Sequence, residues 1–386
     1  MPGNLKFASL PNHDLKKRFY TLIEDVKRGK FNRFGYTTAS ILACKIVAVL
    51  YLYFRFGGPD RFYTTTILLY AATGPEPSYL SVGWDSLWYM NIAQFGYTRL
   101  ASFAFFPFYP LIIRFFYLIS NDIALSAVIP SFICGIASIP LFQRVAEEYM
   151  DKQSAIACTL IAFFFPVIFV FTSLAYGESI FLLLSLLYWL QYRKQRITRA
   201  NIILALATVT RPFGGLLGLP LVIDLVRQRR FRDLLNFAIP SAALFSWLYY
   251  GFYSTGNWLA FRLAETSTIW TQIDWIKGTV LPFFAGQNVP FEAMNFFMVT
   301  IVGFIVVLTF QVDWRLGVLA AATYLSIILF SGPPELSYLR YFSFIFPIWL
   351  IAGRGLPLKI VVPYCFFMMA GSLMMWYAFA FGGWVG

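Results

Sequence analysis

Long runs of apolar residues, separated by short polar or basic segments, recur along the chain from residue 37 onward. Runs of about 20 residues have the length that a helix needs to cross a bilayer. The runs are residues 37–54, 104–119, 123–142, 155–175, 178–191, 200–223, 234–252, 293–311, 316–331, 341–352 and 358–381. This pattern predicts an all-α, polytopic integral membrane protein.

The run at residues 104–119 is poorly suited to crossing a bilayer. Pro107 and Pro110 interrupt the helical hydrogen bonds near its start, and Arg114 would lie at its middle. We therefore expect this segment to lie along the outer membrane surface or to dip into it. It would be part of an outer loop over residues 57–122 that contains surface helices.

The run at residues 200–223 is also interrupted, by the sequence Thr-Arg-Pro-Phe-Gly-Gly at residues 210–215. We interpret it as two short helices that form a hairpin, with both ends cytoplasmic and the break at the tip. Irregular backbone at membrane depth is tolerated only where it lines protein or a water-filled cavity, so the break indicates a site. With these two changes we expect about eleven membrane helices, two of them short.

Basic residues are concentrated on one predicted side of the membrane, where the N-terminal arm and the short loops hold 21 of the 30 lysines and arginines. Segments of this kind face the cytoplasm. The charge pattern predicts a cytoplasmic arm at residues 1–36, a single transmembrane domain at residues 37–386, and an outer C-terminus. The first apolar run starts only after the long arm, which argues against a cleavable signal peptide.

The composition agrees with a membrane protein, because 59% of the residues are hydrophobic and only 12% are charged, against about 25% charged in soluble proteins. The net charge of +12 does not indicate nucleic-acid binding, since the basic residues lie in loops between spans. All four cysteines fall in apolar runs, which favours small buried hydrophobes over disulfides or metal ligands. His13 is the only histidine, which excludes a triad with a histidine base and a histidine-based metal site.

The predicted topology brings polar motifs together at the outer face. They are Asp85, the sequence Tyr-Gly-Glu-Ser at residues 176–179, a second outer loop at residues 253–292, and a Pro-Pro-Glu segment at residues 333–341. Arg211 would approach them from within the membrane. Acidic and arginine side chains are therefore expected to meet at the mouth of an aromatic-rich bundle.

Asp85 is the one carboxylate of its aromatic stretch and lies between Trp84 and Trp88. A carboxylate among bulky aromatics at a membrane surface is costly unless it has a task or a partner, although an interfacial aromatic belt with a water-facing acid fits equally well. Transfer of a sugar with inversion needs one general base and a stabilised leaving group. A retaining hydrolase would need a matched carboxylate pair, and the same motif contains no second one.

Three further charged residues allow two interpretations each. Glu178 either supplies an N-terminal charge to an apolar helix or lines the same cavity and holds the acceptor. Arg211 either forms a buried ion pair, with Asp85 or Glu178, or binds phosphate, whose oxygens match the planar guanidinium. Arg340 is either an interfacial anchor or a second phosphate ligand.

The sequence has no Asp-x-Asp, Walker loop, Gly-x-Gly-x-x-Gly or His/Cys cluster, which disfavours a nucleotide-sugar donor bound through a metal. A lipid-phosphate donor fits better, with arginines in place of a metal at the departing phosphate. We predict Trp84, Tyr176 and Tyr341 as further substrate-binding residues. Lys45 and Arg55, in the first run, are interpreted as snorkelling or cavity residues.

Several short sequences resemble motifs of the GPI mannosyltransferase II (PIG-V-like) family. Its first-loop motif is matched by Trp-Asp at residues 84–85, Asn-Ile-Ala at 91–93, Gly-Tyr at 96–97 and Ala-Phe-Phe-Pro-Phe-Tyr-Pro-Leu at 104–111. Tyr-Gly-Glu-Ser-Ile-Phe at 176–181 resembles its Tyr-x-Glu-Ser-x-Phe element, and Thr-Arg-Pro-Phe-Gly at 210–214 its Thr-Arg-x-x-Gly element. The chain departs from eukaryotic members in being shorter and in having proline after Arg211.

The resemblance implies a glycosyltransferase of the GT-C superfamily with a GT-C-type fold and a helical first outer loop. Such an enzyme would transfer a hexose, mannose above all, from a polyprenyl- or dolichyl-phosphate sugar to a lipid-linked or surface acceptor at the outer or lumenal face. Asp85 would stand in the position of the catalytic base, and no metal cofactor is expected. The departures leave the acceptor open, and a homologue acting on another glycolipid or on a surface protein is compatible with them.

A transporter or flippase of lipids or lipid-linked sugars is the alternative function, because a broken hairpin with a buried arginine suits a translocation path. Against it, we find no internal repeat, and the polar residues gather at one face and not at the midplane. The sequence leaves open the acceptor, the host membrane and any partner subunit.

Overall fold

The computed structural model describes residues 33–55, 85–267, 289–330 and 338–380 of the chain. All regular structure within these ranges is helical. The helices are α2 (Arg33–Arg55), α4 (Asp85–Phe95), η1 (Leu100–Ala104), α5 (Phe108–Ser120), α6 (Ile123–Glu147), α7 (Lys152–Phe164), α8 (Pro166–Phe171), α9 (Glu178–Arg193), α10 (Ile197–Thr208), η2 (Pro212–Gly218), α11 (Leu219–Arg227), η3 (Phe231–Phe237), α12 (Ala238–Thr255), α13 (Ala260–Ser267), α15 (Val289–Val312), α16 (Trp314–Phe330), α17 (Tyr338–Ser343), α18 (Phe346–Ala352) and α19 (Leu358–Ala380). The predicted all-α class is confirmed for this part of the chain.

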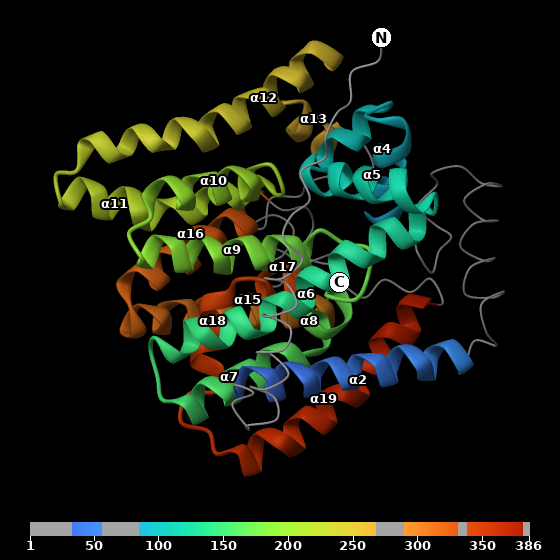
Figure 1. Cartoon of the computed structure of the whole chain (residues 1–386), viewed down its shortest axis with the longest axis vertical. Coiled ribbons are helices and arrows are strands. Elements are labelled where there is room, and N and C mark those ends of the chain that lie inside the picture. Colours follow the sequence, from blue (N-terminus) through green and yellow to red (C-terminus); the bar gives the residue numbers. More distant parts are fainter. Residues whose placement is uncertain (1–32, 56–84, 268–288, 331–337, 381–386) are drawn as a thin grey trace, which may run out of the picture.

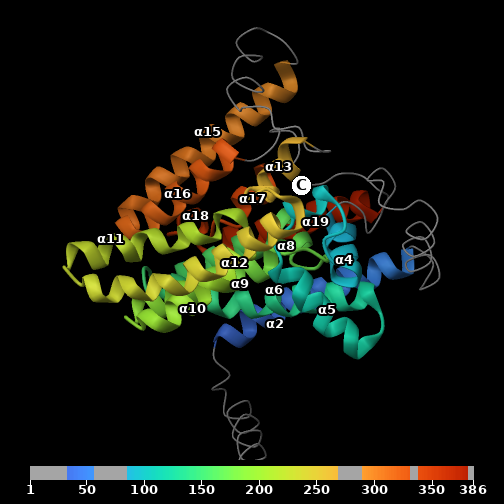
Figure 2. The same ribbon diagram turned by 90° about the horizontal axis from the view of Figure 1, so that it is seen from above.

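Helix α9 lies in the middle of the bundle and packs against α6 on one side and α10 on the other. Figures 1 and 2 show α4, α5 and α13 gathered at one end, with the turn between α11 and α12 at the opposite end. Helices α2, α7 and α19 form one flank, and α15 and α16 pack as a pair on another.

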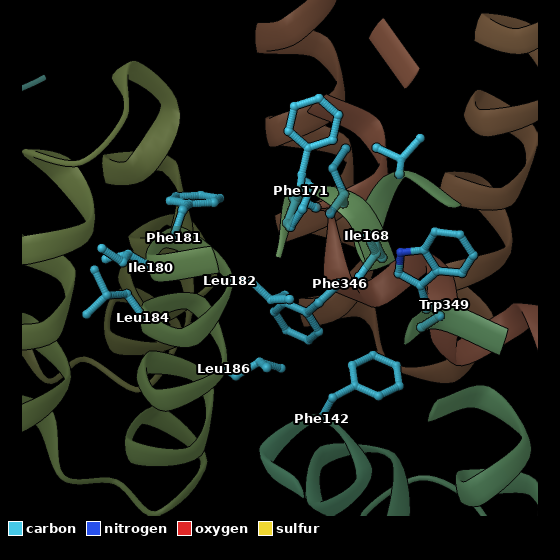
Figure 3. Packing of buried hydrophobic residues seen from close by; sticks show 14 of the residues in the cluster. Phe142, Ile168, Phe171, Ile180, Phe181, Leu182, Leu184, Leu186, Phe346 and Trp349 are labelled. Carbon is cyan, nitrogen blue, oxygen red and sulfur yellow. The ribbon is translucent and has the colours of Figure 1, made fainter. Parts of the chain in front are cut away.

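The core around α9 follows from its almost wholly apolar sequence. Leu182 and Leu186, one turn apart, point toward Phe346 of α18, and Phe142 of α6 lies beside them (Figure 3). All four side chains are buried. Fully burying such a side chain contributes about 1.5–3 kcal/mol, so the dense packing on both flanks of α9 holds the first turn of this helix in a fixed place.

Two described helices are long and apolar enough to cross a membrane, Ile123–Glu147 and Leu358–Phe379. Only 17% of the apolar window of the second helix is buried, and Phe366, Phe367 and Met374 are about three-quarters exposed. A core helix of a soluble protein would bury such residues, so this outward apolar surface suits lipid. The expected number of about eleven membrane helices remains a prediction, because the apolar stretches of the other described helices span only 10–17 residues.

Two apolar runs that we expected to be continuous are broken. The run 155–175 is divided into α7 and α8 at Phe165, and the run 341–352 into α17 and α18 near Ile345. Proline occupies the first or second position of both α8 and α18, where its missing N–H is tolerated although it cannot continue the helix before it. The prolines were visible in the sequence, and treating the runs as single helices was wrong.

The predicted hairpin over residues 200–223 is present as α10, η2 and α11. Its two ends lie close together, since Arg230 Nη1 after α11 donates to Gln195 Oε1 before α10 at 2.7 Å. At the tip, Arg211 is extended and Pro212 begins η2. The backbone of Gly214 passes so close to α10 that a Cβ built on it would lie 2.0 Å from the Ala207 carbonyl oxygen.

The run at residues 104–119 starts at the last residue of η1 and forms the strongly amphipathic helix α5. Tyr109 and Ile113 are buried, whereas Leu118 and Ile119 are more than 70% exposed. One apolar face is thus left uncovered by the protein, as a surface helix resting on lipid requires. Its place relative to the bilayer stays a prediction.

Ion pairs connect several predicted cytoplasmic loops at the C-terminal end of α9. Arg193 lies 3.5 Å from Glu148 and 3.6 Å from Asp313, and Arg315 Nε donates to Asp224 Oδ2 at 2.7 Å. Glu178 begins the same helix, about 22 Å away at 1.5 Å per residue. The loops predicted to face the cytoplasm therefore meet at one end of α9, and Glu178 stands at the other.

We expect Gly214→Ala to lower the stability of the protein by about 1–3 kcal/mol, the usual cost of overpacking. The added methyl group would collide with the backbone of α10, which cannot rotate away as a side chain can. Gly215→Ala is the matched control, because its Cβ would meet only the Thr208 side chain, at 3.6 Å. Thermal unfolding in detergent micelles measures both variants, and equal melting temperatures would contradict the close approach at Gly214.

Candidate functional site

Asp85 is the first residue of α4, and its carboxylate reaches the short helix α17. Arg340 Nη1 donates to Asp85 Oδ2 at 2.7 Å. The Arg340 side chain is 3% exposed and that of Asp85 is 18% exposed. Solvent thus reaches this pair mainly from the side of the carboxylate.

Glu178 is the first residue of α9, and its side chain is 1% exposed. Its Oε1 lies 3.3 Å from Arg340 Nε and forms a close ion pair with Arg211 Nη2. Asp85, Arg340, Glu178 and Arg211 therefore form a row of alternating charge, which we call the ion chain. Its four members come from α4, α17, α9 and the tip of the hairpin.

Aromatic rings cover both guanidinium groups. Arg340 lies over Phe171, Tyr176 and Tyr341 at 5.5, 5.4 and 4.9 Å from the ring centroids. Arg211 lies over the same Tyr341 ring at 5.3 Å. Arg340 Nη2 also donates to the Tyr341 hydroxyl at 3.0 Å. Cation–π contacts of this kind are worth more when the cation is desolvated, so Tyr341 joins the two arginines.

The loop before α9 is held by the neighbouring helix α6. Ser131 Oγ donates to the Tyr176 carbonyl at 3.1 Å and lies 3.0 Å from Ser179 Oγ. Tyr176 packs edge to face on Phe171, with 4.9 Å between ring centroids. These contacts fix Glu178 and the ring of Tyr176 before any substrate arrives.

Burying four charges is expensive, and pairing recovers only part of the cost. Arginine fits such a place because one guanidinium can face two carboxylates at once. Arg340 donates a hydrogen bond to Asp85 and forms an ion pair with Glu178. The ion chain carries no net formal charge. It can bind an anion if the guanidinium groups redirect some of their hydrogen bonds from the carboxylates to that anion.

The structure brings together six of the seven predicted site residues. They are Asp85, Tyr176, Glu178, Arg211, Arg340 and Tyr341. Trp84 lies outside the described residues, as do residues 268–288 of the second outer loop. Of the two interpretations of Arg211, the ion pair is present, and Glu178 is the partner. Arg340 is buried, so it does not serve as an interfacial anchor.

The sequence analysis missed the partner of Asp85, since Arg340 is 255 positions away. Of the two interpretations of Lys45, snorkelling is wrong, because the side chain lies inside the protein. Lys45 is fully buried, and its Nζ donates to the Phe169 carbonyl at 2.5 Å and to the hydroxyls of Thr172 and Ser173 at 2.8 and 2.7 Å. No signal in the sequence identified these oxygens, because they lie in an apolar run far from Lys45.

We expect Arg340→Met to destabilise the protein by about 3–5 kcal/mol, because it leaves the Asp85 carboxylate without its partner and removes one of the two cations beside the buried Glu178. Arg193→Met is the control. Arg193 also faces two carboxylates, but its side chain is 34% exposed, and exposed pairs contribute about 0–1 kcal/mol. Thermal unfolding of both variants in detergent measures the difference, and similar losses would show that burial does not set the strength of the ion chain.

A comparison with family models matches residues 77–255 to the family described as Mannosyltransferase (PIG-V). The matched range includes Asp85, Glu178 and Arg211, and Arg340 lies beyond it. Among solved structures, the chain is similar to the crystal structure of ArnT from Cupriavidus metallidurans bound to undecaprenyl phosphate. The identity is 14% and the TM-score 0.46, over 89% of this chain and 71% of that one, a likeness too distant to assign a site or a substrate. No curated protein matches the sequence.

Proposed function

Because this chain is a membrane glycosyltransferase of the PIG-V-like mannosyltransferase family, we propose that it transfers mannose from a polyprenyl- or dolichyl-phosphate donor to a hydroxyl group. The acceptor is a lipid-linked or surface molecule at the extracytoplasmic or lumenal face. The observation that carries the proposal is the ion chain, which places one partly accessible carboxylate beside two buried guanidinium groups.

In the proposed reaction, Asp85 removes the proton of the acceptor hydroxyl. The hydroxyl oxygen then forms a bond to the anomeric carbon while the bond from this carbon to the phosphate oxygen breaks. The electron pair of that bond leaves with the phosphate, so the lipid phosphate is released and the anomeric configuration is inverted. A single base suffices for this route.

Arg340 and Arg211 stabilise the charge that develops on the departing phosphate. Preorganised cationic donors in a site with little water stabilise such charge without having to reorient during the reaction, and here the aromatic rings hold them in place. We propose that the reaction needs no metal, since the two arginines supply the positive charge. Trp84, Tyr176, Glu178 and Tyr341 then orient the substrates.

The pair between Arg340 and Asp85 also suggests an order of events. While it lasts, the Arg340 guanidinium occupies a carboxylate oxygen that would otherwise be free to receive the proton of the acceptor. A donor phosphate competes for the guanidinium of Arg340 and so frees Asp85 for the acceptor. We propose that the donor binds before the base becomes active.

We expect Asp85→Asn to abolish sugar transfer, lowering the rate by more than tenfold, while the protein remains folded. The amide removes the base, yet its oxygen can still accept from Arg340. Asp122→Asn is the matched control. Asp122 caps α6, where its Oδ1 accepts from Leu125 N–H at 2.9 Å, and asparagine caps equally well. Transfer is measured in detergent with a lipid-phosphate mannose and an extract of lipid acceptors.

Retention of a tenth or more of the activity in Asp85→Asn would remove Asp85 as the base. The same assay separates the enzyme from a transporter, because an enzyme releases lipid phosphate in detergent and a transporter needs a bilayer. Comparing the glycolipids and surface glycoproteins of cells with and without the protein by mass spectrometry would identify the acceptor.

A further inference from the structure

Tyr89 lies one helical turn after Asp85 on α4, on the same face of the helix. Its ring packs edge to face on Phe105 and Tyr109, with centroid distances of 5.0 and 4.8 Å. The side chain is more than nine-tenths buried. These contacts hold the ring firmly, so the position of its hydroxyl is set by the fold.

The hydroxyl of Tyr89 is directed at the ion chain. It lies 3.5 Å from the position that a Cβ would take on Gly177, the residue directly before Glu178. The hydroxyl also experiences the charges of Asp85, Glu178, Arg211 and Arg340. Tyr89 and Asp85 thus face the same group of charges from one helix.

This hydroxyl has no hydrogen-bond partner among the residues that the structure describes. Two neighbouring tyrosines use theirs, since Tyr109 donates to the Ala127 carbonyl at 2.8 Å and Tyr97 to the Phe105 carbonyl at 2.9 Å. The hydroxyl of Tyr176, whose ring covers Arg340, is fully buried and also has no partner among the described residues. The Tyr89 hydroxyl is not one of the fully enclosed unpaired polar atoms of the described residues, so a molecule from outside can reach it. An unused donor beside two arginines is therefore best explained by a ligand that accepts from it.

The ligand must be an acceptor, because Tyr89 stays protonated. Burial raises the pKa of its hydroxyl above the ordinary value, which disfavours the phenolate. Arginine also offers donors only, so Tyr89, Arg211 and Arg340 together suit an oxygen-rich anion. Phosphate fits this description better than a neutral sugar, and charge-assisted hydrogen bonds to it are the stronger ones.

We propose that the Tyr89 hydroxyl donates a hydrogen bond to a phosphate oxygen of the lipid-phosphate donor, and that Tyr89 is a further substrate-binding residue. The assignment rests on the proposed function, because it takes the donor class from there. Tyr89 would hold the phosphate from the side of α4, opposite the guanidinium groups, and so place the anomeric carbon within reach of Asp85.

The test is the binding of a short-chain polyprenyl monophosphate to the purified full chain in detergent. Binding is measured through the change in tryptophan fluorescence. Tyr89→Phe should weaken binding about 10- to 100-fold, the usual effect of losing a hydrogen bond to a charged group. Tyr109→Phe is the control, since it removes a hydroxyl from the adjacent ring that serves only the Ala127 carbonyl. It should lower the melting temperature and leave the affinity within about twofold, a change too small for a lost charge-assisted bond.

Equal affinity of Tyr89→Phe and the unaltered protein would overturn the proposal, as would an equal loss in Tyr109→Phe, which would indicate a packing effect. If the unaltered protein binds no lipid monophosphate, the Tyr89 assignment and the donor class are both wrong. If binding depends on Tyr89 but no sugar is transferred with a lipid-phosphate mannose, the proposed function alone fails.

Discussion

The shared contact of Arg340 with Asp85 and Glu178 is the constraint on which the site depends. Two of these three side chains are almost fully buried, so none of them can leave without stranding a charge where water cannot easily replace the lost partner. The contact therefore fixes α4, α9 and α17 relative to one another. It also explains why α17, only six residues long, can hold a defined position.

Helix α9 connects this contact to the rest of the molecule. Its first residue belongs to the ion chain, and its last residue joins the ion pairs at the opposite end of the bundle. Between them its side chains are packed on both flanks. Charge at both ends and apolar packing between them match the requirements of a helix that runs between two aqueous faces. The two polar networks also keep the bundle in register along α9.

The sequence identified all four members of the ion chain, but not how they pair. The acid at the start of an apolar helix pointed to Glu178, and the break around Pro212 pointed to the hairpin and to Arg211. The pairing of Asp85 with Arg340 could not be read, because contacts between distant segments leave no local pattern. Tyr89 was missed for a similar reason. The Tyr109 hydroxyl meets the Ala127 carbonyl, whereas the Tyr89 hydroxyl lies near Gly177 and the ion chain. The sequence alone does not show which groups surround each hydroxyl.

The buried Lys45 of α2 also depends on hydrogen bonds to distant residues. No carboxylate among the described residues pairs with its ammonium group, which is held by three oxygens at the C-terminal end of α8. Helix dipoles favour a cation at this end, so α8 can stabilise the charge without an acid. The turn that Lys45 holds begins at Phe171, whose ring lies against Arg340, and continues to Glu178. A lysine in α2 thereby supports the segment that lines one side of the site. The position of the ion chain depends on α2 as well as on the three helices that meet there.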